Sequence, residues 1–394
     1  MATATTTTST TSGNTPFESL STEVQAEVRR LQSERKLAKQ VKKKAKLGPE
    51  DAATESDVVA AVAAAKAPSG AAADPKARPS ASAAEGTEDE EEFPDRISMD
   101  EYFEACRGCL RDPNLEANEE NLALVMSVLQ KKDPHSVQLS RCNYFQFAGG
   151  PKKVWDPVFH AKLAWEGFFT ITSSRGREPL PELQPFYGVL TWPNFYKSRH
   201  VRKTLQRLRK GGKEYRLVSS WTQDCWKRLN DYHVVQNQTN WLTLKYFGTM
   251  QAASRDPSIN FRGHCLELYT EEGTEPVAGE IGFSVGKVYT SLSGWTGART
   301  SEAFGTIQLV LLGRCLEKKG YAFWSLGHCY SPQMEYKRQL GHRIYPRQDF
   351  LKLLHKHRGD FRRPTAGSEV FEPLHDETLM SSDLLAEAPP DEAM

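Results

Sequence analysis

HCLELY (residues 264–269), VAGEIGFSVG (277–286) and KVYTSLSGW (287–295) follow one another closely and are rich in β-branched and aromatic residues. The turn-rich segment EEGTEP separates the first two, and Gly286 precedes the third. Short apolar and aromatic runs bounded by Gly and Pro are typical of strands joined by tight turns. The sequence therefore predicts three consecutive strands, of which the first two form a hairpin.

The segments that follow alternate between helix and strand. GTIQLVLLGRCLEKKG (305–320) has apolar residues near helical spacing and ends in a glycine. YAFWSLGHCY (321–330) suits a buried strand, and we expect a second helix from Ser331, as its N-cap, to Gly341. Three strands, a helix, a strand, a helix and a last strand is the order of a GNAT-type acyltransferase core. The predicted fold class is therefore α+β, with this core over residues 239–360.

The rest of the chain differs from this core in composition. With 394 residues, the chain can form one sizeable core with tails or two domains. Low-complexity sequence predicts a disordered leader at 1–95, with one basic helix at about 21–47, and a disordered tail at 361–394. Between leader and core we predict a helical extension at 96–140 and a smaller N-terminal α/β domain, with a basic helix, at 141–238.

Composition also limits the class of protein. No apolar run approaches the ~20 residues that a membrane span needs. Seven cysteines, an odd number without a signal peptide, favour reduced thiols inside the cell. We expect a cytoplasmic monomer, and the Thr- and Ser-rich start leaves a plastid location as the alternative. Cys106 and Cys109 form a lone C-x-x-C pair, so we expect no metal site.

A second informative stretch is LTWPNFYKSRHVRKTLQRLRKGGKEYR (190–216), in which Glu214 is the only acid. At helical spacing Arg199, Arg202 and Lys203 share one face, and Arg207 lies one turn further along. Cations in a row with aromatic residues nearby suit contacts with nucleic-acid phosphates and stacking on bases. The alternative is a solvated amphipathic helix, although the run lacks acids to pair with its cations.

Four segments together resemble the leucyl/phenylalanyl-tRNA–protein transferases. In the order and roughly the spacing of that family, the chain contains LTWPNFYKSRHVRKTL (190–205), TNWLTLKYFGTMQAA (239–253), HCLELY followed by VAGEIG (264–282), and QLGHRIYPRQDFL (339–351). AGGPKKVWDPVFHAKLAWEGFFT (148–170) is similar to the family's N-terminal domain. The residues before Asn143 have no counterpart in the short bacterial members, so the resemblance implies an extended member of eukaryotic type.

The resemblance implies an enzyme that takes an amino acid of the Leu or Phe type from an aminoacyl-tRNA. It would attach this residue to the N-terminal α-amine of an acceptor protein, an N-degron modification that marks the acceptor for degradation. The expected partners are aminoacyl-tRNA and proteins with an exposed N-terminus, without a membrane. No cofactor and no metal are implied, because the tRNA ester supplies the driving force.

Given the activity that the resemblance implies, the cationic and aromatic residues of this chain have expected roles in tRNA binding. Recognition of RNA relies on backbone contacts and on stacking with unpaired bases. The residues expected to contact phosphates are Arg199, Arg202, Lys203 and Arg207, and those expected to stack on the single-stranded end are Trp192, Phe195 and Trp241. For each of these aromatic residues, packing in the core is the alternative.

The sequence departs from the family at its catalytic motif. The family's Asp-Cys-Gln motif supplies a catalytic Asp and Gln, but here the strand ends in SLGHCYS and the Asp position falls on His328 or Cys329. A family Glu is also missing, with Leu292 nearest to it. The candidate replacements are His328, whose neutral imidazole can accept a proton, Glu280, and Gln308, which can orient an amine or a carbonyl. The alternatives are a core histidine at 328 and a solvent-facing or salt-bridged carboxylate at 280.

Two other functions stay open. One is an acyl-CoA-dependent N-acetyltransferase on the same core. That class binds pyrophosphate in an Arg/Gln-x-x-Gly-x-Gly/Ala turn, whose spacing does not occur in GWTGARTSEAFGT (294–306). The other is a non-catalytic tRNA-binding relative, because the family's catalytic Asp and Gln are missing.

Overall fold

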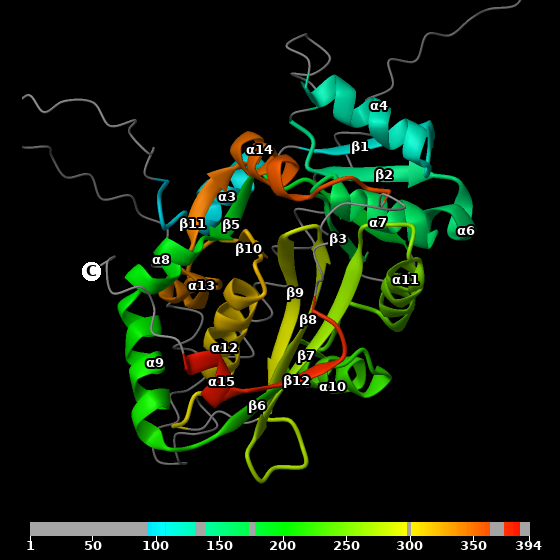
Figure 1. Cartoon of the computed structure of the whole chain (residues 1–394). Helices are drawn as coiled ribbons and strands as arrows, with labels where there is room; N and C mark the ends of the chain where they lie inside the picture. Colours follow the sequence, from blue (N-terminus) through cyan, green and yellow to red (C-terminus); the bar gives the residue numbers. More distant parts are fainter. Residues whose placement is uncertain are drawn as a thin grey trace, which may run out of the picture. The chain divides into compact units, whose positions relative to one another are not determined.

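Two β-sheets organise the part of the chain that the structure describes (Figure 1). The computed structural model describes residues 93–106, 108–130, 139, 141–172, 178–297, 301–362 and 374–386. The expected leader and its basic helix at about 21–47 lie outside these residues.

The strands of the smaller sheet are β1 (Cys109–Glu116), β2 (Tyr144–Ala148), β3 (Phe169–Thr172) and β4 (Pro179–Glu182). Those of the larger sheet are β5 (Phe186–Leu190), β6 (Tyr215–Ser219), β7 (Arg262–Thr270), β8 (Ala278–Val285), β9 (Val288–Thr296), β10 (Phe323–Gly327), β11 (Arg343–Pro346) and β12 (Glu377–Met380). The helices are α3 (Met99–Ala105), α4 (Glu119–Gln130), α6 (Gly150–Val154), α7 (Pro157–Trp165), α8 (Trp192–Lys197), α9 (Arg199–Gly211), α10 (Gln223–Asn237), α11 (Leu244–Arg255), α12 (Phe304–Lys318), α13 (Glu335–Leu340), α14 (Arg347–His357) and α15 (Ser381–Leu385).

The central stretch forms the elements that its sequence predicts. β7, β8 and β9 pair antiparallel as a meander. α12 then leads to β10, which pairs in parallel with β9. An antiparallel meander followed by this strand–helix–strand crossover is the GNAT-type arrangement, so the predicted α+β fold class is confirmed.

One helix boundary in this core differs from the expectation. α13 begins at Glu335 with Met334 as N-cap, whereas the sequence predicts a start at Ser331. The hydroxyl of Ser331 donates to the side chain of Glu335 at 3.0 Å, and residues 331–334 form a bridge and a turn. The predicted end is confirmed, because Gly341 closes the helix in a left-handed conformation.

The large sheet also recruits strands from residues 141–238, where we expected a separate domain. β5 lies between β10 and β11 and is antiparallel to both, and β6 pairs antiparallel with β7. The order of the sheet is β11-β5-β10-β9-β8-β7-β6-β12, whereas the smaller sheet has the order β1-β2-β4-β3. β5 and β6 precede residue 239 but belong to the larger sheet, where their residues Val189 and Leu217 are buried. The expected domain boundary at residue 239 therefore does not separate the two sheets.

Two further segments correct the sequence-based prediction. Within the helical extension expected at 96–140, β1 follows α3 and pairs in parallel with β2, burying Leu115. Within the disordered tail expected at 361–394, β12 pairs antiparallel with β6, and α15 follows it. The apolar side chains of Leu374 and Leu384 explain this order, because both are buried against the same core as α12.

Helices cover both faces of the large sheet. α9 and α12 pack on one face, together with Leu266 of β7 and Ala278 of β8. α10, α11 and α14 contribute to the core on the other face, with Cys265 and Ile281. Side chains alternate between the faces along each strand, and β8 is buried along its whole length. Polar residues of β8 are consequently enclosed between the sheet and its helices.

Candidate active site

Glu280 lies in the middle of β8 and is 2% exposed. It is two residues from Ala278 and so points toward α12. The hydroxyls of Tyr289 and Ser291 donate to its Oε1 atom at 2.7 and 2.8 Å. Burial raises the pKa of Glu280, whereas these hydroxyls and the nearby amide of Gln308 favour its charged form. The structure therefore brings Glu280 and Gln308 together, and neither alternative proposed for the carboxylate, solvent-facing or salt-bridged, is observed.

β9 and β10 separate beside this carboxyl group. Their parallel pairing ends at Ser325 and Thr290, whereas the antiparallel pairing of β10 with β5 on its other side continues to Gly327. Ser291, the next residue of β9, also accepts the indole N–H of Trp324 at 2.8 Å. A register shift opposite Ile281 and Gly282 follows, with Leu292 as the extra residue in β9. The Glu280 network thus lies where the two strands diverge, a place that the sequence pattern alone does not reveal.

Lys337 connects this network to His328. Its ammonium group donates to the carbonyl oxygens of Leu326 and His328, the latter at 2.6 Å. Lys337 is 6% exposed, and burial lowers the pKa of its ammonium group to about 8, although the nearby Glu280 charge acts in the opposite direction. The backbone at the end of β10 is fixed by this lysine, which our sequence analysis missed because it lies in an ordinary polar helix.

His328 pairs with a carboxylate that the sequence analysis also missed. Its Nε2 atom lies 3.1 Å from Oε2 of Glu182, at the end of β4 in the smaller sheet. The His328 side chain is 22% exposed, whereas that of Glu182 is fully buried. Because a carboxylate accepts hydrogen bonds, the neutral ring carries its proton on Nε2 and leaves Nδ1 as a proton acceptor. His328 is therefore an oriented, partly accessible base.

Cys329, the other residue at the family's Asp position, is unsuited to nucleophilic attack. Its thiol is 1% exposed, and burial raises the pKa of Cys329 to about 12. Thiolates are the reactive form of cysteine, and this thiol stays protonated near neutral pH.

The aromatic residues predicted to stack on RNA have different environments. The indole of Trp192 donates to the carbonyl oxygen of Tyr321 at 2.7 Å, and Phe195 is fully buried in the core. Trp241 is half-buried, and its ring centroid lies 5.6 Å from that of Phe169. Phe169 in turn lies 5.4 Å from His328. Of the three, Trp241 is the aromatic residue that the structure links to the His328 neighbourhood.

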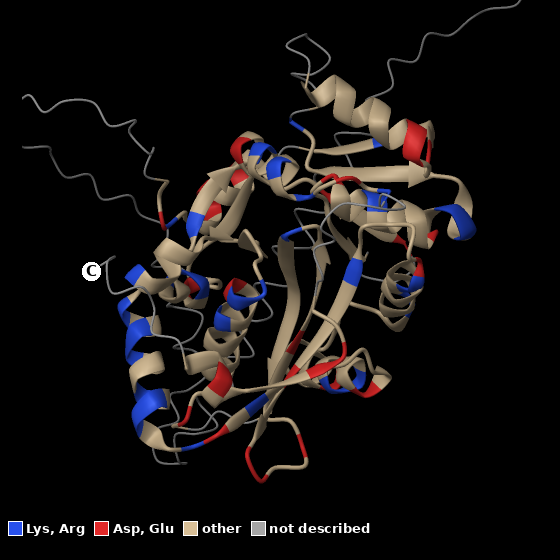
Figure 2. Cartoon of the chain, in the orientation of Figure 1, with Lys and Arg blue, Asp and Glu red and all other residues tan. Residues whose placement is uncertain are grey.

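The predicted basic helix is α9, whose ribbon in Figure 2 carries Lys and Arg colouring and no Asp or Glu colouring. Arg199, Arg202, Lys203 and Arg207 are exposed, whereas Val201 and other apolar residues of α9 are buried. α9 contains no acid, and the ion pairs found among the described residues do not include Arg199, Arg202 or Lys203. The predicted cationic face is thus present and is not neutralised by the part of the fold that the structure describes.

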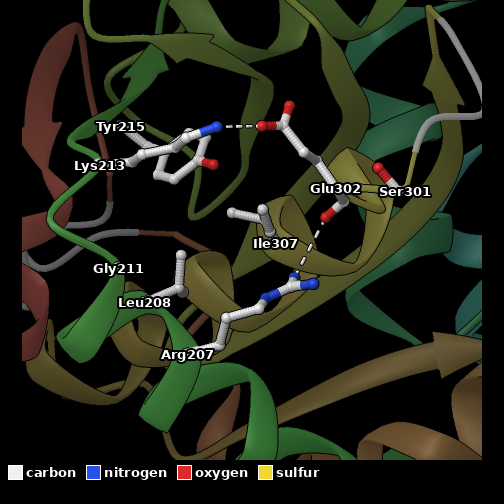
Figure 3. A pocket seen from close by; sticks show the side chains of 8 residues that line it. All are labelled: Arg207, Leu208, Gly211, Lys213, Tyr215, Ser301, Glu302 and Ile307. Atoms are coloured by element: carbon white, nitrogen blue, oxygen red, sulfur yellow. Dashed lines mark hydrogen bonds and ion pairs between the residues drawn. The ribbon is translucent and has the colours of Figure 1, made fainter.

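A cavity of about 220 Å³ lies at the C-terminal end of α9 (Figure 3). Arg207 donates to the backbone carbonyl of Glu302 at 3.1 Å, and Lys213 pairs with the carboxylate of the same residue. The lining residues are Arg207, Leu208, Gly211, Lys213, Tyr215, Ser301, Glu302 and Ile307. The lining contains two cationic side chains and one acidic side chain, so its net charge is positive. The cavity thus continues the cationic face of α9 toward the start of α12.

The described residues contain neither a cluster of metal-binding side chains nor a helix suited to cross a membrane. No group of three or more His, Cys, Asp and Glu side chains in the described ranges has an arrangement that could hold a metal ion. Among the helices described here, none is long and apolar enough to span a membrane.

The solved structures that are similar to this chain include two remote likenesses. No family model and no curated protein matches the sequence. The C-terminal domain of a putative lysylphosphatidylglycerol synthetase from Agrobacterium fabrum is 13% identical, over 58% of this chain and 72% of that one, with a TM-score of 0.32. FemX is 9% identical, over 60% of this chain and 79% of its own, with a TM-score of 0.33. Function must therefore be argued from the site itself.

Proposed function

We propose that this protein transfers an aminoacyl group from an aminoacyl-tRNA to the N-terminal α-amine of an acceptor protein. The observation that carries the proposal is the exposed cationic face of α9, packed beside α12 of an acyltransferase-type core. A helix of 13 residues is about 20 Å long, enough to follow several phosphates of a nucleic-acid strand. The resemblance to leucyl/phenylalanyl-tRNA–protein transferases supports a Leu- or Phe-like donor and an N-degron role.

The path of the cations supports a single-stranded RNA end as the ligand. From Arg199 the exposed cations continue to Arg207, which lines the positive cavity together with Lys213. An RNA backbone is attracted by such a row through release of its counterions. A tRNA bound along α9 would approach the start of α12 and thereby the point where β9 and β10 separate.

The chemistry proposed for His328 is general acid–base catalysis of ester aminolysis. The neutral amine nitrogen attacks the ester carbonyl carbon, so that a C–N bond forms while the C–O bond to the tRNA ribose breaks. Nδ1 of His328 accepts the proton that the amine loses, and the imidazolium returns it to the ribose oxygen. Glu182 holds the Nε2 proton and stabilises the imidazolium.

Glu280 and Gln308 are proposed to act beside this base. The Glu280 network fixes β9 where it leaves β10, through Tyr289 and Ser291. Backbone N–H groups of the separated strand are suited to the negative charge that develops on the carbonyl oxygen. Gln308 would orient the substrate amine or carbonyl from α12.

A transfer assay tests this function. The full chain is incubated with tRNA charged with a labelled amino acid and with a peptide that has a free N-terminal Lys or Arg. We expect label on the peptide, sensitive to ribonuclease and absent with the N-acetylated peptide. Labelling that instead requires acetyl-CoA would make the protein an N-acetyltransferase. Binding of tRNA without either transfer would make it a non-catalytic relative.

Replacing His328 with Gln is expected to lower the transfer rate by roughly 10²- to 10⁴-fold, the usual contribution of a general acid–base residue. Gln keeps a polar side chain that can donate to Glu182 but cannot accept the amine proton. Affinity for tRNA should stay within about twofold of the wild-type value, because the cationic face of α9 supplies the electrostatic part of tRNA binding. The control His357→Gln, on α14, should retain the rate. A wild-type rate in His328→Gln would place the base elsewhere.

A further inference from the structure

β10 ends in an irregular turn just before His328. Its pairing with β5 shifts register between Ser325 and Gly327, so that Leu326 is the extra residue of a bulge. Gly327 has a φ of +64°, in the left-handed region that favours glycine. Bulges re-aim the side chains beside them. The side chain of His328 accordingly reaches Glu182 in the smaller sheet, at 3.1 Å, and not a neighbour in its own sheet.

One ammonium group holds both carbonyl groups that flank Gly327. Nζ of Lys337 donates to the carbonyl oxygen of Leu326 and, at 2.6 Å, to that of His328. Two carbonyl oxygens that share one donor lie with their negative ends close together, an arrangement that a positive charge stabilises. Lys337 lies nine residues after His328, so that its bonds close the segment between them into a loop. The turn that carries His328 therefore depends on this charge.

Stability of the core alone does not account for a lysine at this place. Lys337 is 6% exposed, and burial lowers its pKa, which means that the fold disfavours the charged form. The charge of Glu280 offsets part of this effect, but both hydrogen bonds given for the ammonium group go to uncharged carbonyl oxygens. An apolar side chain of similar length would fill the same space without desolvating a charge. It could not hold the two carbonyl groups together.

We propose that Lys337 is a positioning residue that keeps the imidazole of His328 in place against Glu182 for the transfer reaction. It acts through the backbone, since its hydrogen bond goes to the carbonyl oxygen of His328. The inference rests on the proposed function, in which His328 is the base. A lysine that merely filled the core could be replaced by an apolar residue of equal length without a change in the ring position or in the transfer rate.

The variant Lys337→Met tests this role, because methionine has a similar length and no N–H group. NMR of the full chain with isotope-labelled histidine reports the ring, and His328→Gln assigns its signal. In the wild-type chain we expect an Nε2–H signal that exchanges slowly with water, because Glu182 accepts its hydrogen bond. In Lys337→Met it should exchange at least about tenfold faster, the effect of losing one hydrogen bond to a charged group. An unchanged exchange rate would overturn the inference.

Transfer kinetics separate this inference from the proposed function. Lys337→Met should lower kcat by roughly 10- to 100-fold, the effect of misplacing a catalytic group by a fraction of its reach. KM for aminoacyl-tRNA should stay within about twofold of the wild-type value, because the cationic face of α9 is intact. If the wild-type chain transfers no amino acid, the proposed function fails, whereas the NMR comparison still decides whether Lys337 holds the ring. A wild-type kcat in Lys337→Met would overturn the positioning role.

A matched variant controls for the loss of an enclosed lysine. The side chain of Lys162, on α7, is 13% exposed and pairs with Glu166 at 3.2 Å. Lys162→Met makes the same chemical change, yet it should leave the His328 signal and kcat as in the wild-type chain. Thermal unfolding shows whether each variant is folded. A Lys337→Met chain that is unfolded at room temperature, or an equal loss of the His328 signal in both variants, would contradict the inference, because the lysine would then support the core as a whole.

Discussion

The triple variant Arg199→Glu, Arg202→Glu, Lys203→Glu is expected to bind tRNA at least about 100-fold more weakly than the wild-type chain at about 0.1 M salt. These side chains are exposed on an acid-free helix, so each is available for a phosphate. Each lost contact removes roughly 0.7–0.9 from the slope of log affinity against log salt. The slope should therefore fall by about two. Fluorescence anisotropy with labelled tRNA over a series of salt concentrations measures both quantities.

A second triple variant controls for net charge. Lys152→Glu, Lys227→Glu and Lys356→Glu make the same change in charge at exposed positions on α6, α10 and α14. Long-range attraction weakens equally in both triples, whereas direct phosphate contacts are lost only in the α9 triple. We expect the control to keep tRNA affinity within about fivefold and to keep its salt slope. An equal loss in both triples, or an unchanged slope in the α9 variant, would remove α9 from the interface.

Local sequence patterns predict the central elements of this fold well. β7, β8, β9, α12 and β10 each have their own periodicity and end at a Gly or a turn, so their type and order follow from the sequence. The positions of β5 and β12 do not. β5 enters between β10 and β11, more than a hundred residues later in the chain, through pairing that no local pattern specifies. β12 is only four residues long, and it was hidden in a polar tail.

The same difference between local patterns and long-range contacts applies to the residues of the candidate site. Glu280 and Gln308 meet because a strand residue facing α12 must meet that helix, and this follows once the core is recognised. The partner of His328 does not follow, because Glu182 lies 146 residues earlier and in a different sheet. Tyr102, whose ring centroid lies 5.8 Å from that of His328, comes from α3, still further away in the sequence. Long-range contacts that join the two sheets therefore determine the environment of the proposed base, and single-sequence reasoning has no access to them.

Acidification from pH 7 to about pH 4.5 is expected to lower the free energy of unfolding by on the order of 7 kcal/mol. Three fully enclosed histidines cause this: burial lowers the pKa of His160 to about 4, of His264 to about 3 and of His342 to about 4, from an ordinary value of 6.5. Between these values and 6.5 the unfolded chain binds more protons than the folded chain. The stabilising contribution is thus complete above pH 6.5 and is lost as the pH falls toward the folded pKa values.

Single substitutions resolve that total into its parts. His264→Gln keeps a side-chain amide that can bond the Ser284 hydroxyl, which lies 2.8 Å from Nε2 of His264. This variant should lose about 2.5 kcal/mol of the pH dependence, because Gln takes up no proton on unfolding. Chemical denaturation at a series of pH values measures the difference from the wild-type chain. Identical pH dependence in both proteins would mean that His264 is not held neutral by burial. His342 lies next to the Lys337 charge, which further lowers its pKa. Protonating it places a second positive charge beside Lys337, which is one reason why the folded chain loses stability on acidification.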